Sequence, residues 1–349
     1  MDSTKTVITK ESKNKIRVDY EGKLTFKERM KKKLQSSHTW IKAVVAVLKF
    51  ILMLGVSYVI LFPFFSKIAG SFMGKLDVVD PTVSLIPKHF TLDIYKYIII
   101  DNFYFKAFFN TLLLSIICAL IQTFVACLIG YGLAKFKFKG NKWVMIGVII
   151  TMLIPHNTLK VSMMYRFTNF DIFGIRMFGD GILTSLFGQI DLNNTMTPYI
   201  ILSLGGLAFK NGLYIYMMRQ FFKGVPDELE ESAYVDGSNT FRTFLQIILP
   251  LSIPMMITIF IFSFSWQWTD QFYAGLFSAG SAEDYLWTMV NVVQDPVTPL
   301  IDTAFAGNSL YMGLVTDTAG IMVIIPLVIM YLFCQKYIVQ GIERSGITG

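Results

Sequence analysis

Charged residues are scarce in this chain of 349 residues, in which Asp, Glu, Lys and Arg together make up 16%. Soluble globular domains usually carry about 25% charged residues. Hydrophobic residues make up 54% of the sequence, and the mean hydropathy is +0.53. This balance excludes an ordinary soluble domain and indicates a protein that is surrounded largely by lipid.

Cysteine and histidine are also rare, with three residues of each type. The cysteines lie inside apolar runs without a C-x-x-C spacing, so we expect core residues and no disulfide framework. The histidines are scattered, with no carboxylate or cysteine at ligand spacing, so we expect no metal site and no catalytic residue. These residues are Cys118, Cys127, Cys334, His38, His89 and His156.

The formal net charge of +7 is concentrated in residues 1–42, where Lys31, Lys32 and Lys33 form the tightest cluster. A basic segment directly before an apolar run typically holds that end in the cytoplasm and contacts anionic lipid, so we reject a nucleic-acid partner. Some forty polar residues precede the first apolar run, which does not fit a cleavable signal peptide. We therefore expect the first span to be a retained anchor.

Six apolar stretches approach the roughly 20 residues that a helix needs to cross a membrane. Most are free of charge, although the fourth carries Lys210. The stretches are 43–66, 107–134, 143–159, 198–218, 251–269 and 318–335. The sequence therefore predicts an all-α integral membrane protein with a basic tail (1–42), a six-span domain (43–340) and a C-terminal tail (341–349).

Basic residues predict the orientation of the spans. The short loop 135–142 contains four lysines, whereas the long loop 276–317 contains no Lys or Arg. The positive-inside rule therefore places both termini, loop 135–142 and loop 219–250 in the cytoplasm. Loops 67–106, 165–197 and 276–317 are predicted to lie outside. The first two contain basic residues, so the rule holds on average and not for every loop.

The cytoplasmic segment 221–254 is predicted to fold as a helix, a tight turn and a second helix. Acidic residues gather in the N-terminal half of the first helix, where the helix dipole favours negative charge. Gly237 stands where a helix can end in the left-handed conformation, and Ser238 or Asn239 can cap the second helix. We expect this second helix to end at Pro250, where the chain re-enters the membrane.

The first of these helices is too short to bury its own apolar face, which we expect Leu229, Ala233 and Tyr234 to form. An exposed short helix with acidic and apolar residues is suited to docking on a partner. A solvated re-entrant loop is the alternative interpretation.

The spacing in this segment resembles the EAA loop of permeases from ATP-binding-cassette (ABC) importers. That pattern has E-A-A, three residues, Gly, nine residues and then Ile-x-Leu-Pro. The departure is Ser in place of the first Ala, which exchanges one small residue for another. The matching residues are Glu231, Ser232, Ala233, Gly237, Ile247, Leu249 and Pro250.

Several further stretches resemble sugar-importer permeases of the maltose-transporter type, specifically the six-span subunit of the pair. These stretches are 84–98, 110–116, 130–140, 215–233 and 338–349. The N-terminal tail is longer, and the loop 165–197 is larger, than in that family. The resemblance implies the type I ABC importer permease fold and a place in the bacterial inner membrane.

The resemblance also implies a mechanism and a set of partners. The EAA loop would form a coupling helix that docks on an ATPase dimer, with Glu231 as the polar contact and Ala233 allowing close approach. Gly237 would form the turn, and Leu249 and Pro250 would hold the loop against the membrane. The other partners implied are a second homologous permease in a heterodimer, a solute-binding protein, membrane lipid and a sugar.

ATP is expected on the partner and not on this chain. The segment Gly70–Leu76 is the nearest approach to a phosphate-binding loop, and it lacks the required spacing and the Ser or Thr. No cofactor is therefore expected on this chain, and ATP with Mg would be bound by the ATPase.

Four residues are candidates for contact with the transported molecule. Trp266 and Trp268 could stack on a sugar ring, and Asp270 could bind its hydroxyl groups, although a membrane-interface aromatic belt would explain these residues too. Lys210 lies inside a predicted span, where a charge suggests function; a carboxylate of a partner subunit or a break in the helix would explain it equally well.

Two alternatives remain at this point. The EAA pattern is shared by importers of amino acids, peptides and phosphate esters, so the motif alone does not identify a sugar. A secondary transporter is disfavoured because no span has a central Asp or Glu and no internal repeat is visible.

Overall fold

The computed structural model describes residues 10–11, 17–18, 37–171, 190–278, 286–294 and 309–346. Most of the predicted tail 1–42, and parts of the predicted loops 165–197 and 276–317, lie outside the described residues. The chain divides into two compact units, Met1–Ser66 and Lys67–Gly349.

The first unit contains a short strand pair and most of a long helix. Strands β1 (Lys10–Glu11) and β2 (Arg17–Val18) pair antiparallel. Helix α2 (Ser37–Gly70) begins in this unit and contains the predicted span 43–66. Its 34 residues reach about 51 Å at 1.5 Å per residue, which exceeds the roughly 30 Å of a bilayer core. Its apolar window is not buried within the chain, as expected for a helix whose surroundings are lipid.

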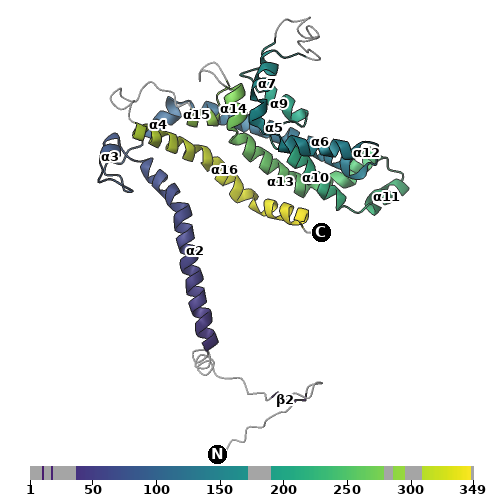
Figure 1. The fold of residues 1–349 in the computed structure, drawn as a ribbon, viewed down its shortest axis with the longest axis horizontal. Helices are drawn as coiled ribbons and strands as arrows, with labels where there is room; N and C mark the ends of the chain where they lie inside the picture. Colours follow the sequence, from purple (N-terminus) through teal and green to yellow (C-terminus); the bar gives the residue numbers. More distant parts are fainter. Residues whose placement is uncertain are drawn as a thin grey trace, which may run out of the picture. The chain divides into compact units, whose positions relative to one another are not determined.

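The second unit is built around two long helices, α5 (Tyr104–Lys135) and α13 (Leu249–Trp268). These helices pack against each other, α10 (Asn211–Lys223) packs on α5, and α16 (Ser309–Gly346) packs on α13 (Figure 1). Small buried residues of α5, such as Ala126 and Gly130, permit this close approach, as is typical of helices packed in membranes.

The third and fourth predicted spans are not continuous helices, which corrects the sequence prediction. In place of span 143–159 the chain forms α6 (Asn141–Leu153) and α7 (His156–Thr168), which are bent by 98° at Pro155. Proline removes a backbone donor and disfavours helical conformation in the preceding residue, so the helix ends there.

The fourth span, predicted at 198–218, separates into α9 (Thr197–Leu204) and α10. Gly206 (φ 67°) and Lys210 (φ 68°) have left-handed backbone conformations between the two helices. Within the described residues, four helices are long and apolar enough to cross a membrane, or five if the bent pair α6–α7 forms one span.

The fifth span begins earlier than predicted, because the second helix of the EAA-like segment does not end at Pro250. Helix α12 (Thr240–Thr243), a π-helical turn η1 (Phe244–Ile248) and α13 form one continuous segment. The Leu249 N–H donates to the carbonyl of Phe244, five residues back. This wider turn ends two residues before Pro250 and accommodates the break in the hydrogen-bond ladder that a proline causes.

Short helices gather at the two opposite ends of the α5–α13 pair (Figure 1). At one end lie α4 (Asp93–Ile100), α14 (Gln271–Phe277) and α15 (Met289–Gln294). At the other end lie α12 and α11 (Glu228–Val235). A further short helix, α3 (Lys75–Val79), contacts α16. The EAA-like segment is therefore at one end of the helical core and α14 is at the other.

Candidate functional site

Helix α11 and the start of α12 form the helix–turn–helix that the sequence predicts. Gly237 is left-handed at φ 83°, and its N–H donates to the Tyr234 carbonyl at 3.0 Å. The Ser238 N–H donates to the Ala233 carbonyl at 2.9 Å, which completes a helix C-cap of the Schellman type. Of the two residues considered for the next cap, Asn239 is the one used, because its Oδ1 accepts from the Arg242 N–H at 2.8 Å.

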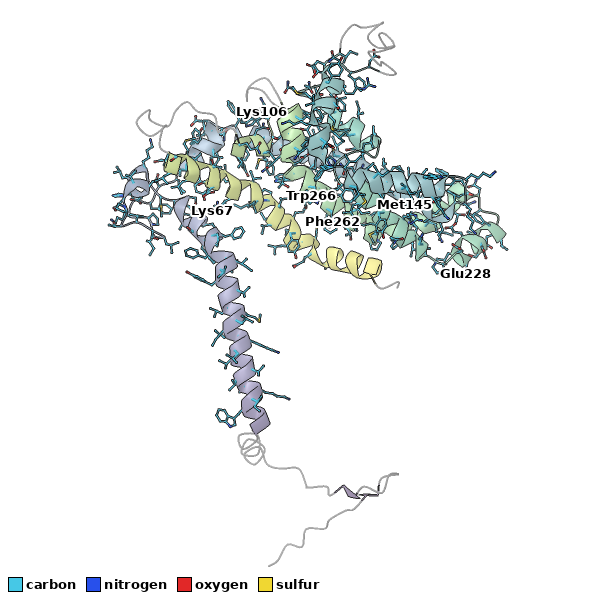
Figure 2. All side chains as sticks on the ribbon, in the orientation of Figure 1. Lys67, Lys106, Met145, Glu228, Phe262 and Trp266 are labelled. Atoms are coloured by element: carbon cyan, nitrogen blue, oxygen red, sulfur yellow. The ribbon has the colours of Figure 1, made fainter. Side chains whose placement is uncertain are left out.

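The outer face of this segment exposes acidic and apolar side chains. Glu231 is exposed, and Glu228 marks the far end of the segment in Figure 2. Ser232 is also exposed, and its hydroxyl donates to the Leu229 carbonyl at 3.1 Å. The exposed apolar side chains are those of Leu229, Tyr234, Val235 (87% exposed) and Phe241 (69%).

Ala233 departs from the sequence prediction. It was expected on the exposed apolar face, but it is buried at 4% exposure against its own chain. Its small side chain therefore permits close packing of α11 inside the subunit, while Val235 and Phe241 extend the face that is open to a partner.

The inner face of α11 is attached to the end of α5 by a buried cation. The Lys135 side chain, only 7% exposed, donates to the Val225 carbonyl at 2.7 Å and forms an ion pair with Asp227. Its Nζ also lies 3.9 Å from Oε1 of Glu230, which is itself buried. The hydrogen bond from Lys135 holds the pKa of Asp227 below its usual value.

An aromatic cluster supports the same junction. The Tyr131 hydroxyl donates to Oε2 of Glu230 at 3.4 Å, and its ring centroid lies 4.9 Å from that of Phe244 and 5.5 Å from that of Phe222. Ile247 and Leu249 of the motif pack against this cluster, whereas Pro250 is exposed. The EAA-like segment is therefore joined to α5, α10 and α13 by packing as well as by charge.

The substrate candidates separate into two groups. Trp266 of α13, labelled in Figure 2, lies beside Lys210, whose Nζ is 5.0 Å from the Trp266 ring centroid and 4.8 Å from that of Phe209. Trp268 is buried in the core, where its indole N–H donates to the Val323 carbonyl at 3.0 Å. This placement does not support a contact between Trp268 and a sugar ring.

Asp270 has a structural position as the N-cap of α14. Its Oδ1 accepts from the N–H groups of Phe272 and Tyr273 at 3.0 and 3.1 Å. Its Oδ2 is buried without a hydrogen-bond partner among the described residues. Asp270 and Trp268 line a cavity of only about 10 Å³, which is separate from the surroundings of Lys210.

Sequence reasoning missed several residues of both regions. Tyr131 and Lys135 are one turn apart on α5, but each lies more than 90 residues before its partner Glu230, and no local spacing relates them to it. Beside Lys210, the ring centroid of His156 lies 4.6 Å from that of Phe209. The sequence did contain signals for the surroundings of Lys210, namely Pro155 and the Gly205–Gly206 pair. Both predict an interruption of a helix, and such interruptions can bring distant segments together.

No group of three or more His, Cys, Asp or Glu residues able to hold a metal ion occurs within the described part of the chain. Cys118 and Cys127 are free and buried, and Cys334 is free and half-buried.

Comparison with known proteins gives a consistent result. Residues 122–344 match the family described as the binding-protein-dependent transport system inner membrane component. The chain is 26% identical to the polygalacturonan/rhamnogalacturonan transport system permease protein YtcP of Bacillus subtilis, over 82% of this chain and 92% of the relative. It is 28% identical to the arabinooligosaccharides transport system permease protein AraQ of the same organism, over 87% and 96%.

A solved structure has a similar fold. It is a chain of a bacterial ABC transporter involved in the import of the acidic polysaccharide alginate. The TM-score is 0.64 at 20% sequence identity, and the match covers 84% of this chain and 96% of that chain. At this identity the likeness concerns the fold.

Proposed function

Since the chain belongs to the family of binding-protein-dependent transport system inner membrane components, we propose that it is the permease subunit of an ABC importer for a sugar or an oligosaccharide. The names of its relatives support a carbohydrate, because they refer to permeases for arabinooligosaccharides, starch degradation products and polygalacturonan. These names include neutral and acidic sugars, so they do not choose between the two.

The main structural support for this proposal is helix α11, which is suited to couple the permease to an ATPase. The helix presents Glu231 and Val235 outward beside Phe241 of α12, and its inner face is held by Lys135. An exposed helix that is attached rigidly to a long membrane helix can transmit a push from a partner. The partner is an ATPase dimer, which binds ATP and Mg and carries out the hydrolysis.

The transport step follows from this attachment. When the two ATPase subunits close on ATP, α11 moves with them, and Lys135 and the cluster around Tyr131 pass the motion to α5, α10 and α13. Packed helices move as rigid bodies, so the core pivots and opens the pathway to the opposite side of the membrane. A second homologous permease completes the pathway, and a solute-binding protein delivers the sugar from outside.

Substitution of the outward-facing acid tests the coupling role. In the importer reconstituted with its ATPase, Glu231→Lys should abolish the substrate-stimulated part of ATP hydrolysis, or prevent the ATPase from copurifying, because it reverses the charge on the docking face. Asp93→Lys is the matched control, since Asp93 is also exposed but lies on α4 at the other end of the core. Unchanged stimulated hydrolysis in Glu231→Lys would refute the role.

A further inference from the structure

The two broken spans meet at a small pocket. It is formed where α6 turns into α7 and where α9 gives way to α10, and its volume is about 130 Å³. Pockets that enclose a whole drug-sized ligand measure roughly 300–1,000 Å³, so this pocket admits one functional group of a larger molecule. Its polar lining comes mainly from Thr151, His156 and Lys210.

Lys210 brings an uncompensated positive charge to this pocket. Among the residues that the structure describes, no acidic side chain forms an ion pair with it. Its ammonium lies against the faces of Phe209 and Trp266, which stabilise a cation but do not neutralise it. Ionisable residues inside membrane segments usually face a cavity or pair with another group, and Lys210 lines this pocket, so its charge is open to an anion that enters it.

The backbone at this position adds to the positive potential. Helix α10 begins at Asn211, directly after Lys210, and its first-turn residues Gly212 and Leu213 line the pocket. The N-terminus of a helix carries partial positive charge, and half-helix N-termini in transporters are directed at anionic groups of the substrate. A Cβ on Gly212 would lie 2.6 Å from the Thr151 hydroxyl, so α6 and α10 are in direct contact at the pocket wall.

We propose that this pocket binds the carboxylate of an acidic sugar as it crosses the membrane. The Lys210 ammonium donates hydrogen bonds to the carboxylate, and the half-exposed ring of Trp266 contacts the apolar face of the sugar. The rings hold Lys210 in place while the site is empty. This inference rests on the proposed function and adds to it that the imported saccharide contains uronate residues.

Uptake by the complete importer in proteoliposomes tests the inference. The probes are trisaccharides of galacturonate, glucuronate and mannuronate, each paired with the neutral trisaccharide of the corresponding hexose. The wild-type protein should take up at least one uronate probe. Lys210→Met should reduce that uptake about tenfold or more, as expected when a charge-assisted hydrogen bond is lost, and Lys210→Arg should retain most of it. Lys142→Met, at an exposed lysine of α6, is the control and should have no effect.

The outcomes separate this inference from the proposed function. Uptake of neutral probes only, or uronate uptake that Lys210→Met leaves unchanged, would overturn the carboxylate site while sugar import stands. Loss of the partner permease from purified Lys210→Met importer would also overturn it, because Lys210 would then pair with a carboxylate of that subunit. Failure of the wild-type importer to take up any sugar would instead count against the proposed function.

Discussion

At the scale of single residues, the position of Lys135 is the most informative. Its side chain is nearly buried at the C-terminal end of α5, where Asp227, Glu230 and the Val225 carbonyl surround it. A buried charge requires such partners, because the loss of hydration is otherwise uncompensated. Lys135 therefore pairs with Asp227 and Glu230 and fixes the orientation of α11, although Oε1 of Glu230 has no hydrogen-bond partner among the described residues.

Substitution of Lys135 should loosen α11. We expect Lys135→Met to lower the free energy of unfolding by about 1–3 kcal/mol, the range for a buried polar group left without its partner. Thermal unfolding of the purified full chain in detergent measures the change. Addition of Glu230→Gln to Lys135→Met should recover part of the loss, since the remaining buried group is then uncharged.

The control for this substitution is Lys139→Met, on the exposed loop that follows α5. It removes the same charge from the same end of the molecule and should leave unfolding unchanged. Equal destabilisation by the two substitutions would show that general charge, and not the contacts of Lys135, stabilises this end.

At the scale of elements, the close contact between α5 and α10 requires a residue without a side chain at Gly130. A Cβ on Gly130 would lie 2.6 Å from the Cβ of Met218 and 3.0 Å from the backbone nitrogen of Arg219. Neither atom is the free end of a flexible side chain, so a change of rotamer cannot relieve the overlap. The two helices must separate if Gly130 is replaced.

Gly130→Ala should therefore destabilise the core by about 1–3 kcal/mol, as is typical of overpacking. Gly132→Ala provides the comparison, because the nearest atom to its added Cβ is 4.0 Å away and alanine favours a helix over glycine by up to about 1 kcal/mol. Thermal unfolding of both variants measures the difference. A Gly130→Ala protein as stable as Gly132→Ala would show that α5 and α10 do not approach this closely.

At the scale of the whole second unit, the two ends of the core are expected on opposite sides of the membrane. The lysine-rich loop after α5 lies beside α11, and the loop that contains Ile86 precedes α4 at the opposite end. Clustered lysines are retained on the cytoplasmic side of a membrane. The α11 end is therefore expected inside the cell, where an ATPase can reach it.

Cysteine labelling in intact cells measures this orientation. A membrane-impermeant maleimide should label Ile86→Cys, whose site is 83% exposed, and should label Lys139→Cys only after the membrane is opened. Both substitutions are made together with Cys334→Ser, because Cys118 and Cys127 are buried but Cys334 is half-buried. The opposite labelling pattern would place α11 outside and would exclude docking to a cytoplasmic ATPase.

Hydropathy and motif spacing in the sequence were sufficient to determine the class of the protein. The uncharged run 107–134 could only be a membrane helix, and it became α5. The spacing from Glu231 through Gly237 to Pro250 predicted the helix–turn–helix and its family. Both features depend on residues that are near one another in the chain, so they can be recognised from the sequence alone.

The tertiary structure decided how distant residues combine. In the folded chain the third and fourth spans are interrupted, and Lys135 lies beside Glu230. Ala233 and Trp268 are buried, and Lys210 lies beside Trp266. Each of these outcomes depends on which helices pack together and on their rotation about their own axes. Hydrophobicity selects the segments that enter the membrane, but it is nearly the same on all sides of each helix. The choice of packing partner for each helix therefore depends on the fit of small residues such as Gly130 and on the pairing of buried polar groups.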